Sequence, residues 1–358
     1  MKLTALEHTF LDLAAIDEVH PRESKILTYI KERLSSVEVA HTQDVAGNIV
    51  AHLPATIGET LALVGHVDIA APLAGRKVIV EADIIKTDGT GLLGADDKAA
   101  VAVMIELADA IARGDVIPTR PIELIFTVGE EAGCAGAMAL DMNLIQAKSA
   151  LVLDWTGRVN HIVTKSPAYY KIDIEYTGRT AHPAEWQQGK NAGAALINAA
   201  SALKQGEYTP GVTCNIGIFN FGQARNQVPG TAMLQAELRS YDTSKIQTAA
   251  ADIQQLFQYA ADEAGLGVNL SITADSPAYE LNQSSELFAA TRDALEFIGL
   301  KPNLEPTYGC FDGNILSARG VEVVMLGAGY YNPHSPVEYL DRAEFNELDS
   351  FVRGLIIG

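Results

Sequence analysis

Histidine and carboxylate side chains recur directly after short apolar runs of this sequence, at positions where predicted strands end. The residues are His66 and Asp68 after the run 61–64, Glu130 and Glu131 after the run 122–128, and Asp154 after the run 151–153. Imidazole and carboxylate groups together are the ligands that zinc, cobalt and manganese accept in proteins. The residue types therefore indicate chemistry that depends on divalent metal ions.

Two more segments add residues of the same types. Asp96 and Asp97 precede a helical pattern at 97–112, and His334 lies in a Tyr-Asn-Pro-His-Ser segment near the C-terminal end. Ligands of open α/β sheets collect beyond the carboxyl ends of the strands, so these side chains are expected to meet there. Asp97 is expected to contribute only negative charge at a helix N-terminus.

The elements that must position these residues alternate between strand and helix patterns in the first half of the chain. This order predicts an α/β fold whose mostly parallel sheet is flanked by helices. Between 166 and 274 the pattern changes to long alternating strands with two helices. After 274 the alternation of helix and strand patterns returns. We therefore predict a metal-binding catalytic domain formed by 1–165 and 275–358, with a smaller α+β domain inserted at 166–274.

Composition narrows the classes of protein to which the chain can belong. It has 358 residues, of which 48% are hydrophobic, and a formal net charge of −19. That amount of apolar material excludes a mostly disordered chain, and the negative charge disfavours nucleic acid and anionic membranes as partners. Three cysteines without a CxxC pair, and no signal peptide or transmembrane segment, predict a cytoplasmic protein.

Several of these motifs resemble those of a known enzyme family. The segments are Gly65-His66-Val67-Asp68, Gly94-Ala95-Asp96-Asp97-Lys98-Ala99 and Thr127-Val128-Gly129-Glu130-Glu131-Ala132-Gly133. They resemble the metal-site motifs of the dinuclear zinc peptidases and deacylases that include peptidase T, carboxypeptidase G and aminoacylase. The resemblance extends to Gly178-Arg179-Thr180-Ala181-His182-Pro183, to the stretch from Asn226 to Arg239, and to the loop Gly309-Cys310-Phe311-Asp312-Gly313-Asn314. It covers residues 65–339, most of the chain.

The resemblance implies a role for each matching residue. His66 and Asp154 would hold one ion, Glu131 and His334 the other, and Asp96 would bridge the two ions. Glu130 would be the general base, Asp68 would orient His66, and His182 would stabilise the oxyanion from a partner subunit. Arg239, Asn226 and Asn314 would bind substrate. The remaining motif residues Cys134 and Asp312 are interpreted as packing and as turn formation.

The resemblance also implies a reaction. Two divalent ions, zinc first and cobalt or manganese as alternatives, would activate water for hydrolysis of amide bonds in small substrates. A tripeptidase-like aminopeptidase acting as a homodimer through the inserted domain is the first hypothesis. The alternatives are a deacylase of N-acyl amino acids and a peptide-binding protein that needs metal but lacks catalysis. The small peptide or N-acyl amino acid is the expected partner.

Overall fold

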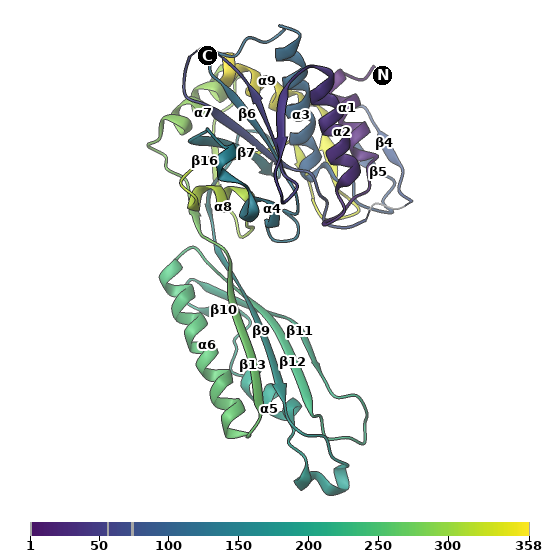
Figure 1. Cartoon of the computed structure of the whole chain (residues 1–358), viewed down its shortest axis with the longest axis vertical. Coiled ribbons are helices and arrows are strands. Elements are labelled where there is room, and N and C mark those ends of the chain that lie inside the picture. The colour runs from purple at the N-terminus through teal and green to yellow at the C-terminus, as the bar shows by residue number, and fades with distance from the viewer. Residues whose placement is uncertain (1, 56, 73–74, 358) are drawn as a thin grey trace. The chain divides into compact units, whose positions relative to one another are not determined.

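The computed structural model describes residues 2–55, 57–72 and 75–357. The chain divides into two compact units, and each is described separately below. The larger unit contains Met1–Thr164, Glu280–Thr307 and Phe311–Gly358, and the smaller unit contains Lys165–Tyr279 and Tyr308–Cys310. The smaller unit is therefore inserted into the sequence of the larger one, which is built from both ends of the chain (Figure 1).

A mixed sheet forms the centre of the larger unit, in the order β1-β2-β6-β3-β7-β16-β8-β14, with β15 paired to β8. The strands are β1 (Ala40–Gln43), β2 (Ile49–Leu53), β3 (Leu61–His66), β6 (Ile122–Thr127), β7 (Ser149–Trp155), β8 (His161–Ser166), β14 (Tyr279–Glu280), β15 (Asn303–Pro306) and β16 (Glu322–Gly327). The four central strands β6, β3, β7 and β16 are parallel. Their carboxyl ends consequently lie at one edge.

The predicted α/β fold is confirmed, but the sheet is mixed rather than mostly parallel. β2 runs antiparallel to β1 and to β6, and β8 runs antiparallel to β16. The pair β1 and β2 is antiparallel because a tight turn joins them, in which the Asp44 carboxylate accepts the backbone N–H groups of Gly47 and Asn48. A parallel pair would have needed a long crossover connection.

Helices cover the sheet of the larger unit (Figure 1). They are α1 (Ala5–Ala14), α2 (Ser24–Ser36), α3 (Ala95–Ala112), α4 (Ala135–Ala139), α7 (Glu286–Phe297), α8 (Asp312–Ala318) and α9 (Arg342–Ile357), with a short 3₁₀ helix at Met142–Leu144. α3 packs against α1, α2 and α9 and against the strands β3 and β7. Residues 95–110 of α3 are all buried, and its charged side chains Glu106 and Asp109 pair with Arg33 of α2.

A second, smaller sheet in the larger unit has the order β17-β18-β5-β4. Its strands are β4 (Val78–Val80), β5 (Ile84–Thr87), β17 (Tyr330–Tyr331) and β18 (Tyr339–Asp341). β17 and β18 form an antiparallel pair in which Tyr330 lies opposite Leu340. The loop between these two strands carries His334, so this hairpin positions one of the predicted metal ligands.

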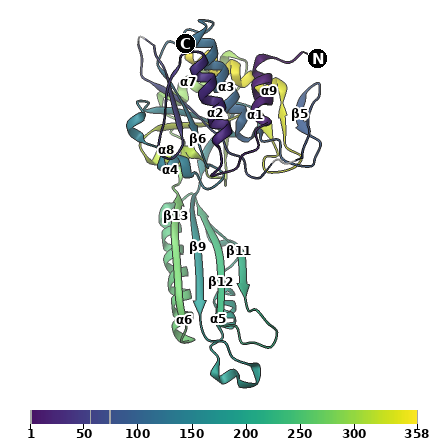
Figure 2. The ribbon, with the colours of Figure 1, turned by 45° about the vertical axis from the view of Figure 1, so that its right-hand side comes forward.

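The smaller unit is an α+β arrangement, with one five-stranded antiparallel sheet in the order β10-β11-β12-β9-β13. Its elements are β9 (Ala168–Thr177), the 3₁₀ helix Pro183–Gln188, α5 (Ala192–Ala200), β10 (Gly206–Thr209), β11 (Val212–Phe221), β12 (Thr231–Ser240), α6 (Thr243–Glu263) and β13 (Gly267–Ser276). Figure 2 shows α5 and α6 on one face of this sheet. The rings of Tyr176 and Phe257 pack edge to face in the hydrophobic core of this unit.

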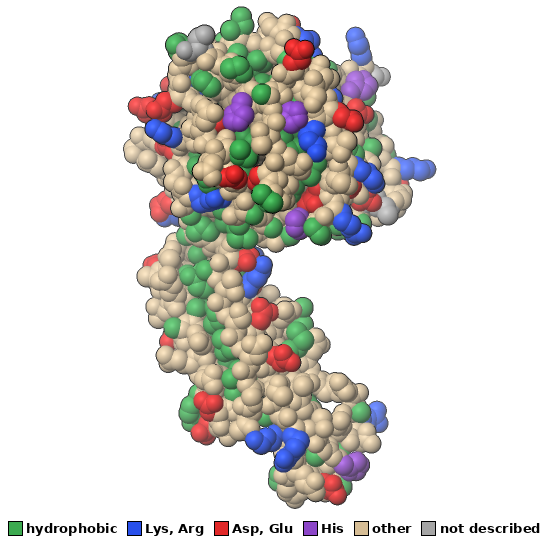
Figure 3. All heavy atoms as spheres, in the orientation of Figure 1, with side chains coloured by type: hydrophobic (Ala, Val, Ile, Leu, Met, Phe, Trp, Pro, Cys, Tyr) green, Lys and Arg blue, Asp and Glu red, His purple; other side chains and the backbone are tan. Residues whose placement is uncertain are grey.

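Charged side chains are dispersed over one face of the protein. On the face shown in Figure 3, acidic and basic side chains are scattered and do not gather into one large patch. The charged side chains of this face are therefore ordinary solvated groups. Across the described residues, none of the helices is long and apolar enough to cross a membrane.

Candidate metal centre

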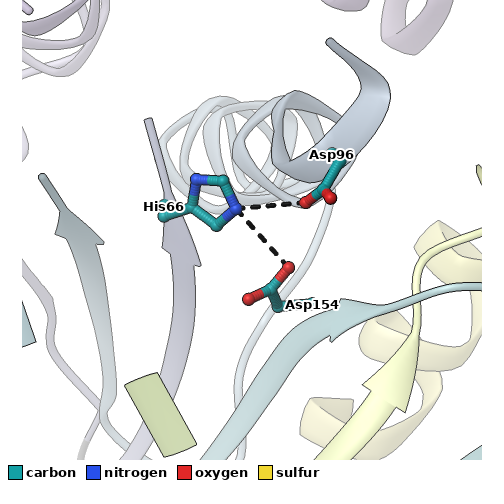
Figure 4. Close-up of side chains that lie close together, drawn as sticks. All are labelled: His66, Asp96 and Asp154. Atoms are coloured by element: carbon teal, nitrogen blue, oxygen red, sulfur yellow. Dashed lines mark hydrogen bonds and ion pairs between the residues drawn. The ribbon is translucent and has the colours of Figure 1, made fainter. Parts of the chain in front are cut away.

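Three residues from three different elements meet at the carboxyl edge of the central sheet (Figure 4). His66 ends β3, Asp96 lies in the first turn of α3, and Asp154 lies near the end of β7. His66 Nε2 is 3.1 Å from Asp96 Oδ1 and 3.5 Å from Asp154 Oδ1. The three side chains thus direct one ligand atom each toward a common point, as in a site for a metal ion.

A second group of three residues shares Asp96 with the first. His334 Nε2 is 3.1 Å from Asp96 Oδ2 and 2.8 Å from Glu131 Oε1. The two oxygens of Asp96 therefore face different groups, Oδ1 toward His66 and Oδ2 toward His334. One carboxylate between two sets of ligands is the arrangement that a pair of neighbouring metal ions needs.

Glycines next to two of these residues allow the close packing of the site. A Cβ on Gly65 would lie 2.8 Å from Asp97 Oδ2 and 3.0 Å from the Ala100 side chain, so only glycine lets α3 approach β3 this closely. Gly94 caps the start of α3 with a φ of 72°, in the left-handed region that favours glycine. Both residues belong to motifs that the sequence singles out.

Asp68 connects His66 with the turn that carries the two glutamates. His66 Nδ1 lies 3.1 Å from the backbone oxygen of Asp68 and 3.3 Å from its Oδ1. The Asp68 carboxylate also accepts the backbone N–H groups of Glu130 at 3.0 Å and Glu131 at 3.2 Å. These contacts orient the imidazole so that Nε2 faces Asp96 and Asp154.

Asp97 is more than a charge at a helix end, and that interpretation from the sequence is wrong. Its side chain is fully buried, and Oδ2 accepts the backbone N–H of His66 at 3.2 Å. Burial, with Asp154 as the next contribution, raises the pKa of Asp97 well above its usual value. The sequence marks Asp96 and Asp97 as an adjacent pair, but nothing in it distinguishes a charge at a helix end from a buried acceptor of the His66 N–H.

Tyr330 is a residue of this site that the sequence did not reveal. Its hydroxyl lies 3.2 Å from Asp96 Oδ1 and 3.2 Å from Asp154 Oδ1, and the side chain is buried. The hydroxyl can donate to only one of these oxygens at a time. Tyr330 lies outside the sequence motifs. The pairing of β17 with β18 brings its side chain to the site.

Asp312 is likewise buried, which overturns its interpretation as a simple turn residue. It begins α8 with 1% of its surface exposed. Burial raises the pKa of Asp312 to about 6, although Thr127 and the charge of His66 act to lower it. Cys134 Sγ lies 3.6 Å from Glu130 Oε1, and the charge of Asp312 acts to raise the pKa of Glu130, so both residues lie near the predicted general base. Asn314 is also buried, and its Oδ1 accepts the backbone N–H of Phe311.

The electrostatics of the site favour added positive charge. Burial raises the pKa of Asp154 to about 7, although His66 lowers it, and burial together with Asp154 raises the pKa of Glu130 well above its usual value. Burial alone would lower the pKa of His66, yet the carboxylates around it, led by Asp154, raise it well above normal. Bonds to Asp96 and Glu131 raise the pKa of His334 to about 11. Divalent ions would supply this charge while binding neutral imidazoles, so the residues fit metal ions.

The remaining predicted residues belong to the smaller unit. His182 is exposed, and its Nδ1 accepts the backbone N–H of Ala184, while Asn226 is exposed in the loop before β12. Arg239 is held on three sides. It bonds to both oxygens of Glu237, donates to the backbone oxygen of Tyr308 at 2.6 Å, and stacks over the Tyr169 ring at 4.6 Å.

Comparison with known proteins identifies the family. The model of peptidase family M20/M25/M40 matches residues 81–357. The uncharacterised protein YqjE of Bacillus subtilis is 31% identical over 357 residues, which cover 97% of this chain and 96% of that protein.

Two solved structures resemble the chain over nearly its whole length. A tripeptidase from Staphylococcus aureus is 30% identical with a TM-score of 0.91, and the aminopeptidase PepT from Bacillus cereus is 29% identical with a TM-score of 0.87. Each likeness covers 99% of this chain and 97% of the other. The family match and these similarities agree with the motifs and with the shared position of Asp96, and the chain belongs to peptidase family M20/M25/M40.

Proposed function

We propose that this family M20 peptidase is an aminopeptidase that holds two metal ions and hydrolyses short peptides, tripeptides among them. The observation that carries the proposal is the position of Asp96, whose two oxygens face His66 and His334 at 3.1 Å each. The likeness to a tripeptidase and to an aminopeptidase at about 30% identity supports the choice of substrate.

Five residues would hold the two ions. His66, Asp96 and Asp154 would bind one ion, and Asp96, Glu131 and His334 the other. Imidazole and carboxylate donors suit zinc, and they also accept cobalt or manganese. When bound, the ions supply Lewis-acid polarisation of the scissile carbonyl group and of water.

Glu130 would move the proton. It lies in a turn fixed by Asp68 and next to Glu131, and its surroundings favour the protonated carboxyl group. In this proposal Glu130 accepts a proton from the attacking water and then donates it to the leaving amine. The raised pKa suits a group that must both accept and release a proton during one turnover.

Residues of the smaller unit would bind the rest of the substrate. Arg239 offers a planar guanidinium for a peptide carboxylate, and Glu237 and Tyr169 hold it in one orientation. Asn226 would orient the same end of the peptide, and Asn314, in α8 of the larger unit, would also bind substrate. His182 would stabilise the developing oxyanion.

A homodimer formed through the smaller unit is part of the proposal, with His182 acting in the active site of the partner subunit. Mixing His182→Ala protein with Glu130→Gln protein would then restore part of the activity, because one site of each mixed dimer regains both groups. Mixed dimers that stay inactive would count against the sharing. A cytoplasmic location is also proposed, on the odd number of cysteines without a CxxC pair.

A substrate panel tests the proposed function. Protein loaded with Zn²⁺ is incubated with tripeptides, dipeptides and N-acyl amino acids, and the products are separated by chromatography. We expect release of the N-terminal residue from tripeptides as the fastest reaction. Release of acyl groups alone would contradict an aminopeptidase and indicate a deacylase, and no turnover of any compound would contradict both enzymes.

A further inference from the structure

Glu338 is a buried glutamate whose carboxylate accepts four successive backbone N–H groups. Oε2 accepts those of Leu93 at 2.7 Å and Gly94 at 2.8 Å. Oε1 accepts those of Ala95 at 2.7 Å and Asp96 at 3.1 Å. With 1% of its surface exposed, the side chain is fully committed to the segment that opens α3.

These four amides belong to the part of the chain that presents Asp96. The first N–H groups of a helix have no partner within the helix, so an outside acceptor fixes where the helix begins. Here that acceptor comes from a residue 242 positions away in the sequence. The bond to the N–H of Asp96 itself ties the backbone of the shared carboxylate to Glu338.

Glu338 also stands at the end of the loop that presents His334. Its backbone N–H donates to the Ser335 oxygen at 3.1 Å, and Ser335 Oγ donates to the Asn332 oxygen at 2.8 Å. His334 has a φ of 60° in this loop, in the left-handed region that residues other than glycine adopt uncommonly. The backbone N–H of Glu338 thus closes the loop that carries His334, while the carboxylate of Glu338 accepts the backbone N–H groups at the start of α3.

We propose that Glu338 is a positioning residue that sets the separation between Asp96 and His334, and thereby assembles the second group of metal ligands. The proposal rests on the proposed function, since it assumes that these groups bind metal ions. In this account Glu338 touches neither substrate nor ion. It acts by fixing the backbone of one ligand relative to the loop of the other, and His334 Nε2 can therefore face Asp96 Oδ2 and Glu131 Oε1 together.

The test uses Glu338→Gln, which preserves size but leaves one oxygen where four N–H groups need acceptors. Glu123→Gln is the matched control, because Glu123 is equally buried in the same unit and accepts the backbone N–H groups of Gln146 and Ala147. Full-length protein stripped with a chelator is titrated with Co²⁺, and binding is followed by calorimetry and by the visible absorption bands of the bound ion.

The expected result is a selective loss of one ion. Glu338→Gln weakens binding of one Co²⁺ equivalent about 10- to 100-fold, in the range that supporting partners of metal ligands contribute. Its absorption bands change as well, because the ligand geometry changes, whereas Glu123→Gln keeps both affinities and the spectrum of the wild type. Glu338→Asp, which keeps the charge but shortens the side chain, shows the same loss and covers the case in which the glutamine variant does not fold.

Three outcomes would overturn the proposal. A folded Glu338→Gln protein with wild-type affinity for both Co²⁺ equivalents would mean that Glu338 only caps the start of α3. An equal loss in Glu123→Gln would assign the effect to general destabilisation. Wild-type protein that binds no Co²⁺ would contradict the proposed function itself, which distinguishes that failure from a failure of Glu338 alone.

Discussion

The Asp68 carboxylate accepts the backbone N–H of Glu130 at 3.0 Å, so the residue that faces His66 also anchors the predicted general base. The same carboxylate lies 3.3 Å from His66 Nδ1. One side chain thereby relates the strand end of β3 to the turn after β6. Removal of this link is expected to disturb metal binding and proton transfer together.

Asp68→Asn should reduce turnover with little change in fold. The amide retains one acceptor oxygen, and two backbone N–H groups and the imidazole now compete for it. We expect kcat/KM for a tripeptide to fall about 10- to 100-fold. Steady-state kinetics measure this, with circular dichroism as the check on folding.

Asp173→Asn is the control for Asp68→Asn, since Asp173 is exposed on β9 of the smaller unit. This variant should retain wild-type kinetics. Turnover that is unchanged in Asp68→Asn would mean that the carboxylate does not orient His66 or the turn of Glu130.

Much of the site could be predicted because its residues lie at strand ends inside recognisable motifs. The strands β3, β6 and β7 are short apolar runs, and their buried positions explain why the sequence marks them so clearly. His66, Glu131 and Asp154 lie at or just beyond the ends of these runs, whereas Asp96 lies at the start of a helical pattern. Their meeting at one edge follows from the parallel central strands.

Other parts depend on contacts between distant segments, which no local pattern encodes. Tyr330 reaches Asp96 and Asp154 only because the two-residue strand β17 pairs with β18. Such short strands carry no periodicity of their own. The burial of Asp312 depends in the same way on α8 packing against α4 and β16. The pattern of predicted helices and strands changes near residues 165 and 275, and the unit boundaries of the structure lie at 164/165 and 279/280.

Tyr330→Phe should weaken the larger unit and its metal site. The variant loses a buried hydroxyl that donates to a carboxylate, an interaction worth about 1.5–3 kcal/mol. Urea denaturation in the presence of a chelator measures this loss of stability, and Co²⁺ titration measures the site. Tyr176→Phe is the matched control, because its hydroxyl donates to the Phe257 backbone oxygen in the smaller unit. If Tyr176→Phe alone weakened Co²⁺ binding, the role of Tyr330 would be refuted.

Gly65→Ala should destabilise the protein although it adds only a methyl group. The new Cβ would lie 2.8 Å from Asp97 Oδ2 and 3.0 Å from the Ala100 side chain. Forcing such a contact costs about 1–3 kcal/mol. Gly354→Ala in α9 is the comparison, because nothing lies within 4 Å of its added Cβ. It should stabilise the protein by about 0.5–1 kcal/mol, and thermal denaturation that ranks the two variants in the opposite order would contradict the packing described.

Stability should fall in acid partly through Glu7. Burial opposes ionisation of this carboxyl group, but Arg342, with Nε 2.5 Å from Oε1, and Thr4 outweigh it, and the pKa of Glu7 is lowered. A lowered pKa in the folded state means that the stabilisation is present above the usual value near 4.5 and is lost as the pH falls through the folded value.

Urea denaturation between about pH 6 and about pH 3 tests the contribution of Glu7. Glu7→Gln should depend less steeply on pH than the wild type in the acid range. Glu32→Gln, on the exposed face of α2, should retain the wild-type slope. Identical slopes for the wild type and Glu7→Gln would remove Glu7 as a cause of acid sensitivity.

The count of metal ions per chain, measured together with peptide hydrolysis, tests the central claim most directly. Chelator-stripped protein is supplied with Zn²⁺, freed of unbound ions, and analysed by mass spectrometry of the metal alongside a tripeptide assay. The account predicts two ions per chain, with hydrolysis absent before loading and restored after it. Stripped protein that still cleaves tripeptides, or loaded protein that binds no ion, would contradict it.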